Sequence, residues 1–193
     1  MTSGPSPAAI PLVSEDDEAL RRLAAGGIPP SNLYRVLANQ PAMLEAWTAF
    51  AWKLRRECVT PRDLRELLIL RAAQLTGARY IWQDHVPMAL EAGVRRDRID
   101  ELHEWRRAAD QFSGRERIAL AFAEQVIVDG EPQEDVLLEL AEAFVIPERI
   151  ELAMTIGFYA MVPRVLAALR VPLAPVDGPG AGPAVPFRPA PHG

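Results

Sequence analysis

Residues 64–94 read LRELLILRAAQLTGARYIWQDHVPMALEAGV and contain two helical patterns separated by the turn Thr76-Gly77-Ala78. In the first pattern apolar residues cover most of the helix circumference, which is typical of a helix buried on all sides. Gly77 is suited to end that helix, because glycine readily adopts the left-handed conformation found at helix C-termini. A three-residue link favours antiparallel packing of the two helices. The stretch therefore predicts a buried helical hairpin.

Two polar residues, Glu66 and His85, lie on the apolar faces of these helices. At 100° per residue Glu66 shares a face with Ile69, and His85 shares a face with Met88. Both are similarly distant from the intervening turn, so they can meet in an antiparallel hairpin. A carboxylate is rarely buried without a partner. An imidazole and a carboxylate in one apolar pocket can act as a general acid/base, which makes this pair the candidate catalytic site.

The rest of the chain also reads as helical, and strand-like alternation appears nowhere over a useful length. Ser113 and Glu116 form an S-x-x-E capping box, Ser14 with Asp17 resembles another, and Thr60 is placed to cap a helix that begins at Pro61. The sequence predicts an all-α fold with helices over about 14–26, from 31, and over 41–58, 61–77, 79–92, 96–107, 113–128, 132–144 and 147–169.

The two ends of the chain have a different composition from the centre. Residues 1–13 are small, polar and Pro-containing, so we expect them to be flexible, and residues 172–193 are rich in Pro and Gly, so we expect a disordered tail. One helical domain, 14–171, lies between them, with its core motif at 61–94. A weak echo between GVRRDRIDEL (93–102) and FVIPERIELA (144–153) leaves open whether the domain consists of two related helical halves.

Composition excludes several classes of protein. The net charge of −5 is spread along the chain, which argues against nucleic-acid binding. The longest apolar stretch, LAMTIGFYAMVP (152–163), is shorter than a membrane span, and no secretory signal is visible, so we expect a cytoplasmic protein without membrane contact. The single cysteine, Cys58, excludes an intrachain disulfide, a cysteine metal cluster and a C-x-x-C redox pair.

The hairpin resembles the core of the carboxymuconolactone decarboxylase / alkyl hydroperoxidase D family. The resemblance rests on the order R-E-L-x-I-L-R, L-T-G, Y-x-W-x-x-H and A-L-E-A-G over about thirty residues, 64–94. It implies a helical bundle of the alkyl hydroperoxidase D type that needs no organic cofactor and no metal. It also implies a homo-oligomer, a trimer or a hexamer, that acts on a small-molecule substrate.

In the hydroperoxidase members of this family, a glutamate and a histidine relay protons for a C-x-x-C pair. Glu66 and His85 match the relay, whereas Ala78 and Ile81 stand at the two cysteine positions. Dithiol reduction of a peroxide needs one thiolate to attack and another to resolve the product. Peroxidase chemistry of the family's type is therefore not expected from this chain.

The decarboxylase members need no cysteine pair, and the resemblance implies a lyase or isomerase for a small lactone or enol-type acid. His85 would transfer the proton, and Glu66 would orient the imidazole. Tyr80 and Trp82 are candidates to line the substrate pocket. Arg79 is the candidate to bind a substrate carboxylate.

A non-catalytic interpretation of the same two residues also stays open. His85 could be a core residue, and Glu66 could simply pair with Arg62 or Arg71. The chain would then be a non-catalytic member of the family that binds a small ligand or serves as a scaffold.

Overall fold

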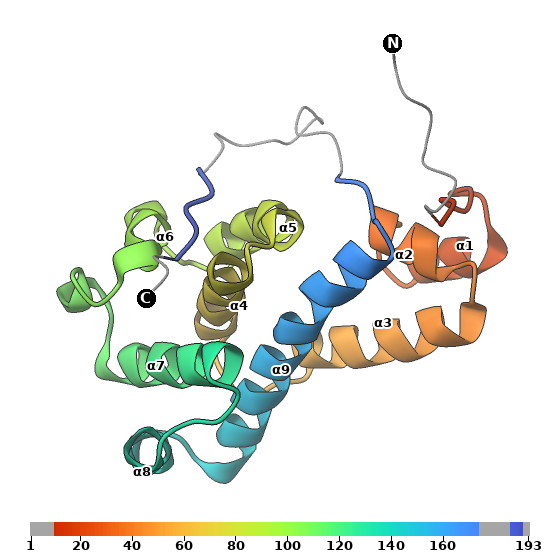
Figure 1. Cartoon of the computed structure of the whole chain (residues 1–193). Coiled ribbons are helices and arrows are strands. Elements are labelled where there is room, and N and C mark those ends of the chain that lie inside the picture. The colour runs from red at the N-terminus through yellow and green to blue at the C-terminus, as the bar shows by residue number, and fades with distance from the viewer. Residues whose placement is uncertain (1–9, 174–185, 191–193) are drawn as a thin grey trace.

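The computed structural model describes residues 10–173 and 186–190, and within these ranges all regular structure is helical (Figure 1). The centre of the bundle is α4 (Arg62–Thr76), in which every residue from Leu64 to Gln74 is buried. It packs against α5 (Arg79–Glu91), α7 (Gly114–Val128) and α9 (Ile146–Ala168). The predicted buried hairpin is thus the core of the fold.

The turn of the hairpin has the predicted chemistry. Gly77 has φ 68 and ψ 20, the left-handed conformation that a residue with a Cβ adopts only at a cost. Its backbone N–H donates to the carbonyl of Ala73, and the N–H of Ala78 donates to the same carbonyl. The chain therefore reverses within two residues, and α5 returns along α4.

Three helices precede the hairpin: α1 (Glu18–Ala25), α2 (Asn32–Leu37) and α3 (Pro41–Arg56). Ser31 caps α2, and Pro41 occupies the first turn of α3. Two predicted caps were wrong. Asp17 rather than Ser14 caps α1, and Thr60 does not cap α4 because its hydroxyl and its backbone N–H both donate to the carboxylate of Glu151 at 2.8 Å. That contact instead ties the loop before α4 to α9.

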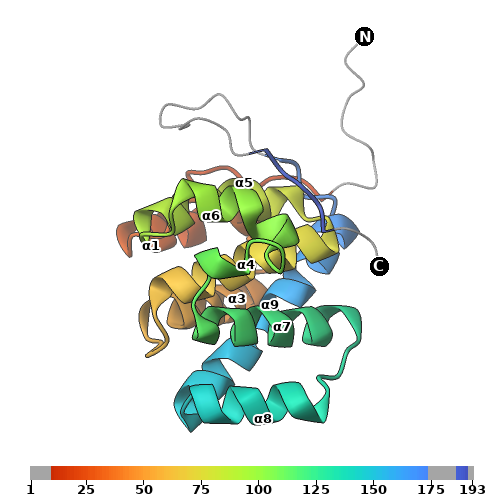
Figure 2. The same cartoon turned by 90° about the vertical axis from the view of Figure 1, so that its left-hand side faces the viewer.

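The remaining elements follow the hairpin in chain order. The predicted helix over 96–107 is shorter, with α6 (Arg96–Glu101) followed by a 3-10 turn at Leu102–Glu104. The capping box of Ser113 and Glu116 is present in both directions at the start of α7. Figure 2 shows α5 and α6 above α4, with α7 and then α8 (Glu134–Ala143) below.

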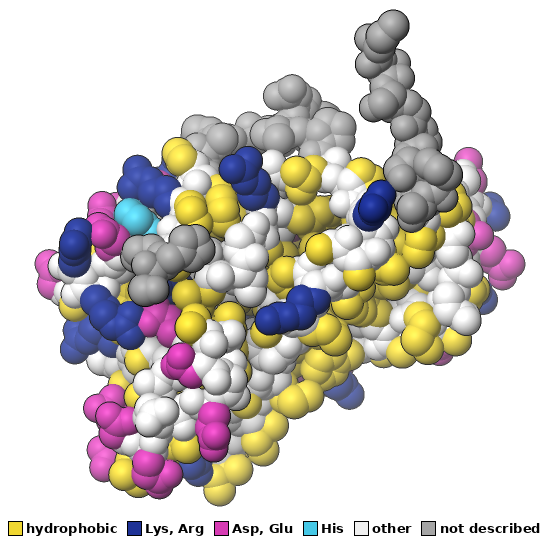
Figure 3. Space-filling model, viewed as in Figure 1, with side chains coloured by type: hydrophobic (Ala, Val, Ile, Leu, Met, Phe, Trp, Pro, Cys, Tyr) yellow, Lys and Arg dark blue, Asp and Glu magenta, His cyan; other side chains and the backbone are white. Residues whose placement is uncertain are grey.

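The last helix, α9, has one buried and one exposed face. Leu152, Ile156 and Val162 pack into the main core, whereas Ile146, Ile150, Met154 and Met161 are exposed apolar residues. Figure 3 shows hydrophobic atoms at the surface in the region of α9. By length and composition α9 meets the criterion for a membrane span, which the sequence was not expected to contain. A core helix of a soluble protein meets the same criterion.

Part of the tail expected to be disordered lies against the bundle. The Phe187 ring stacks edge-on against Trp82 with ring centroids 5.6 Å apart, and the backbone N–H of Ala190 donates to the carbonyl of Gln74 at 3.2 Å. At the other end, the N–H of Val13 donates to the carbonyl of Arg35. Residues 1–9, 174–185 and 191–193, on which the remaining expectations for the termini fall, lie outside the described residues.

Candidate active site

Glu66 and His85 meet in the interior of the hairpin, as their faces predicted. Nδ1 of His85 lies 2.7 Å from Oε2 of Glu66. The Glu66 side chain is completely buried, and His85 is 9% exposed. Because α4 and α5 run antiparallel from the turn at Gly77, two residues 19 apart in sequence reach hydrogen-bond distance.

Arg62 completes the group on the other carboxylate oxygen. Its guanidinium forms an ion pair with Oε1 of Glu66, one helical turn away on α4. Partial burial lowers the pKa of Arg62, and the charge of Glu66 opposes that effect. The expected alternative partner, Arg71, instead pairs with Glu124 on α7. Glu66 therefore lies between one guanidinium and one imidazole.

This arrangement fixes the proton on the imidazole. A carboxylate can only accept hydrogen bonds, so the bond to Glu66 places a proton on Nδ1 of His85. Nε2 is then the ring nitrogen that can take up or give a proton. The Tyr159 ring packs edge-on against the imidazole with centroids 4.9 Å apart and holds its plane. A histidine oriented by a buried carboxylate is suited to general acid/base catalysis.

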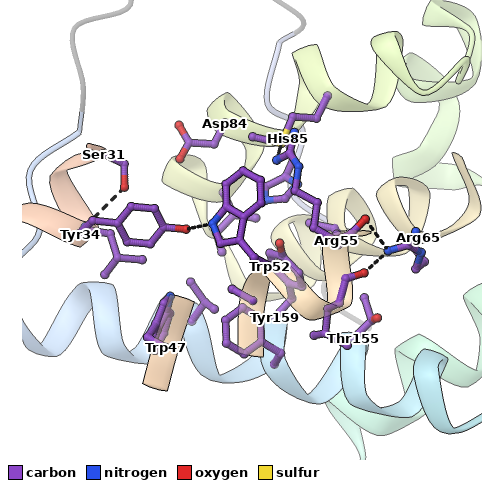
Figure 4. Close-up of a pocket in the computed structure, with 18 of the residues that line it drawn as sticks. Ser31, Tyr34, Trp47, Trp52, Arg55, Arg65, Asp84, His85, Thr155 and Tyr159 are labelled. Atoms are coloured by element: carbon purple, nitrogen blue, oxygen red, sulfur yellow. Dashed lines mark hydrogen bonds between the residues drawn. The ribbon is translucent and has the colours of Figure 1, made fainter. Parts of the chain in front are cut away.

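His85 lines a cavity of about 390 Å³ enclosed by residues of α2, α3, α4, α5 and α9 (Figure 4). Much of its wall is aromatic: Tyr34, Trp47, Trp52, Tyr80, Phe158 and Tyr159. On α9 the lining residues are Thr155, Phe158, Tyr159 and Val162, the i, i+3, i+4 and i+7 positions of one helix face. This volume and this wall suit a small ligand with a flat apolar body.

The cation best placed for an anionic ligand is Arg55, which the sequence did not single out. Arg55 lines the cavity, and its guanidinium lies 4.9 Å from the centre of the Trp52 ring and 2.8 Å from Sδ of Met88. Among the described residues no carboxylate pairs with it. Arg65 also lines the cavity, but it is buried and donates to the backbone carbonyls of Leu54 and Thr60. Arg55 is thus the available positive charge.

The structure brings one of the three predicted substrate-binding residues to this cavity. Tyr80 lines it, and burial raises the pKa of its phenol to about 12. Trp82 and Arg79 do not line it: both lie on the side of α5 where Phe187 packs, Trp82 being buried and Arg79 exposed. The helical periodicity already placed Trp82 on the core side of α5, but it could not show which core residues border a cavity.

Asp84 is a second ionisable residue of the cavity, although the helical pattern places it outside the apolar face of α5 that His85 shares. It is half-buried and lines the same cavity as His85. Burial raises the pKa of its carboxyl, and the nearby imidazole of His85 opposes that effect. Residues of α2 and α3 line the same cavity beside this face of α5, and the hairpin pattern alone carries no information about those helices.

The two positions that correspond to the family's cysteines carry aliphatic side chains. Ala78 stands at the N-terminus of α5, and Ile81, buried at 3% exposure, lines the cavity one turn before His85. Cys58 does not line the cavity, and burial raises the pKa of its thiol. Within the part of the chain that the structure describes, no three His, Cys, Asp or Glu side chains lie together as a metal site requires.

Comparison with known proteins agrees with the fold and with the hairpin. Residues 41–125 match the model of the carboxymuconolactone decarboxylase family. The debrominase Bmp8, solved as a variant in complex with 2,3,4-tribromopyrrole, has TM-score 0.75 and 20% identity over 88% of this chain and 92% of its own. No curated protein matches significantly.

Two further solved structures have the same architecture. The alkylhydroperoxidase AhpD core of an uncharacterized peroxidase-related protein from Ralstonia eutropha JMP134 has TM-score 0.71 and 19% identity over 88% of this chain and 94% of its own. A peroxidase-related protein from Silicibacter sp. TM1040 has TM-score 0.69 and 18% identity over 89% and 94%. The match to the family model and the shared fold both support the resemblance to the carboxymuconolactone decarboxylase / AhpD-like family that the hairpin sequence indicates.

Proposed function

We propose that this protein is a cofactor-independent lyase or isomerase that acts on a small lactone or enol-type acid by proton transfer. One observation carries the proposal: His85 and Glu66 are joined at 2.7 Å inside an aromatic cavity, with Arg62 on the second carboxylate oxygen. With Nδ1 occupied by Glu66, Nε2 is the ring nitrogen of this cavity-lining residue that remains for proton transfer to a ligand.

Each residue has a defined role in the proposed reaction. Arg55, rather than the predicted Arg79, binds a substrate carboxylate. In a decarboxylation, the bond between the ring carbon and its carboxylate breaks, carbon dioxide leaves, and the electron pair enters the unsaturated ring system. His85, protonated on Nε2, then gives its proton to the carbanion equivalent. Glu66 stabilises the imidazolium that precedes this transfer, as a buried carboxylate does for an active-site histidine.

Hydroperoxidase activity of the dithiol type has less support. That chemistry needs two thiols, and the corresponding positions hold Ile81 in the cavity wall and Ala78 at the start of α5. Neither side chain can attack a peroxide. The neighbours described as peroxidase-related share the fold at 18–19% identity, which does not carry their chemistry to this chain. Assembly into a homo-oligomer and a cytoplasmic location stay predictions.

Turnover of γ-carboxymuconolactone, followed as carbon dioxide release, tests the proposal. We expect release by the wild type and a loss of roughly 10²–10⁴-fold in His85→Gln, because general acid/base groups contribute about that much. Glu151→Gln is the matched control, since Glu151 binds the loop at Val59 and Thr60 and does not line the cavity. Equal rates in wild type and a folded His85→Gln would contradict the proposal.

The non-catalytic alternative makes a different prediction for the same variant. If His85 only fills space, His85→Gln should lower the free energy of unfolding by about 1–2 kcal/mol and change nothing else. Unfolding of both proteins in denaturant, measured beside the rates, separates the two interpretations.

A further inference from the structure

The carboxyl of Asp84 is not used by the proton-transfer group. Glu66 has two partners, Arg62 and His85, whereas among the described residues no Lys or Arg pairs with Asp84. Asp84 adjoins His85 in sequence and lines the same cavity, but it faces Tyr34 from α2 and Tyr80 from its own helix. Figure 4 shows Asp84 near Tyr34, on the other side of Trp52 from Arg65 and Thr155.

The two phenols near Asp84 form their hydrogen bonds with other groups. The Tyr34 hydroxyl accepts a hydrogen bond from Nε1 of Trp52 at 3.2 Å, and the Tyr80 hydroxyl accepts one from the backbone N–H of Leu33 at 3.4 Å. No hydrogen bond joins Asp84 to either phenol. Asp84 is half-buried and lines the cavity, so its carboxyl keeps only part of its water. A ligand with a donor at this position would replace the water that binding displaces.

We propose that Asp84 is a specificity-determining residue that accepts a hydrogen bond from a hydroxyl or ring N–H of the ligand. The inference rests on the proposed function and names its substrate class: a small, flat, unsaturated ring acid that carries a hydrogen-bond donor. The carboxylate lies at Arg55, the ring lies between the aromatic walls formed by Trp47, Trp52 and Phe158, and the donor lies at Asp84.

Selection at Asp84 would work by exclusion as much as by attraction. An acceptor at this position favours a ligand with a hydroxyl over an analogue without it, because binding displaces water from Asp84 and only the hydroxyl replaces it. A methoxy group in place of the hydroxyl removes the donor and keeps the oxygen. The hydroxyl and methoxy members of one ring acid therefore form a matched pair of ligands.

Binding of benzoates to the purified full-length chain tests the inference without turnover. The probes are 3- and 4-hydroxybenzoate, their methoxy counterparts and benzoate, because two ring positions allow for either placement of the donor. Quenching of tryptophan fluorescence reports binding, since Trp47 and Trp52 line the cavity. We expect the wild type to bind at least one hydroxybenzoate roughly tenfold more tightly than its methoxy partner, the factor of one net charged hydrogen bond.

Three variants locate the preference. Asp84→Ala should bind both members of the pair equally, and Asp84→Asn, which keeps an acceptor oxygen but no charge, should keep a smaller preference. Gln83→Ala is the matched control, because Gln83 is the exposed neighbour on the same helix and does not line the cavity. It should retain the tenfold preference.

Three results would overturn the inference: no binding of any probe at millimolar concentration, equal binding of the pair by the wild type, or an unchanged preference in Asp84→Ala. Failure of the proposed function looks different, because it appears as absent turnover and leaves the benzoate preference intact. The two ideas can therefore fail separately.

Discussion

Replacement of Glu66 by Gln is the sharpest single perturbation of the buried group. Gln keeps the shape of Glu and removes the charge that both Arg62 and His85 contact. Charged hydrogen bonds contribute about 1.5–3 kcal/mol each, and the loss of one partner of a fully buried pair costs about 3–5 kcal/mol. The Arg62 side chain is 27% exposed and regains some water, so we expect a loss of about 2–3 kcal/mol.

The same change should alter the protonation of His85. The amide group of Gln can donate to Nδ1, which a carboxylate cannot, and the neutral imidazole would then carry its proton on Nε2. A ring with the wrong tautomer cannot act as a base, and without the carboxylate the imidazolium loses its stabilising charge. We expect a fall in kcat of about 10²-fold or more.

Two measurements on one preparation test both expectations. Thermal unfolding should show Tm lower by about 4–12 °C, at roughly 2–4 °C per kcal/mol for a domain of this size. Carbon dioxide release from γ-carboxymuconolactone measures kcat. A variant that unfolds earlier but retains kcat within about threefold would refute the reasoning, because the pair would then contribute only to packing.

Two further predictions concern polar side chains of the cavity. Thr155 is buried, and its hydroxyl has no hydrogen-bond partner among the described residues. Thr155→Val should therefore raise the free energy of unfolding by about 1 kcal/mol. Thr48→Val is the control and should not raise it, because it removes a 2.8 Å hydrogen bond to the carbonyl of Leu44. Burial raises the pKa of Asp84, so the folded state holds its proton to higher pH than the unfolded state, and stability falls as pH rises through that window. Asp84→Asn does not ionise and should be more stable than the wild type at pH 7, with the difference shrinking toward about pH 4 when followed by denaturant titration.

The parts of the site that lie within the hairpin could be predicted from the sequence. The turn at Gly77, the inward faces of Glu66 and His85 and their meeting all follow from helical periodicity and a short antiparallel link. These features depend on neighbours less than about twenty residues apart. The family assignment rests on the same stretch.

The parts that depend on distant segments could not be predicted. Arg55 reaches the cavity from α3 and Thr155 from α9, and nothing in the spacing of either residue indicates which helix it will face. Arg79 was favoured because it is near His85 in sequence, yet consecutive residues on a helix point about 100° apart, and its side chain lies on the Phe187 side. Asp84 lines the cavity from a different face of α5 than His85, and periodicity could not indicate this because it describes one helix and not the helices packed around it.

The replacement of two thiols by Ala78 and Ile81 has a consequence for how the protein would meet oxidative stress. Peroxide drives an active-site thiol through sulfenic acid to irreversible acids and so silences enzymes that depend on one. The three groups proposed to transfer the proton, the imidazole of His85, the carboxylate of Glu66 and the guanidinium of Arg62, undergo no such change, since they exchange protons and not electrons. The only thiol of the chain, Cys58, lies outside the cavity. With two side chains exchanged, the cavity has no thiol left for an oxidant to disable.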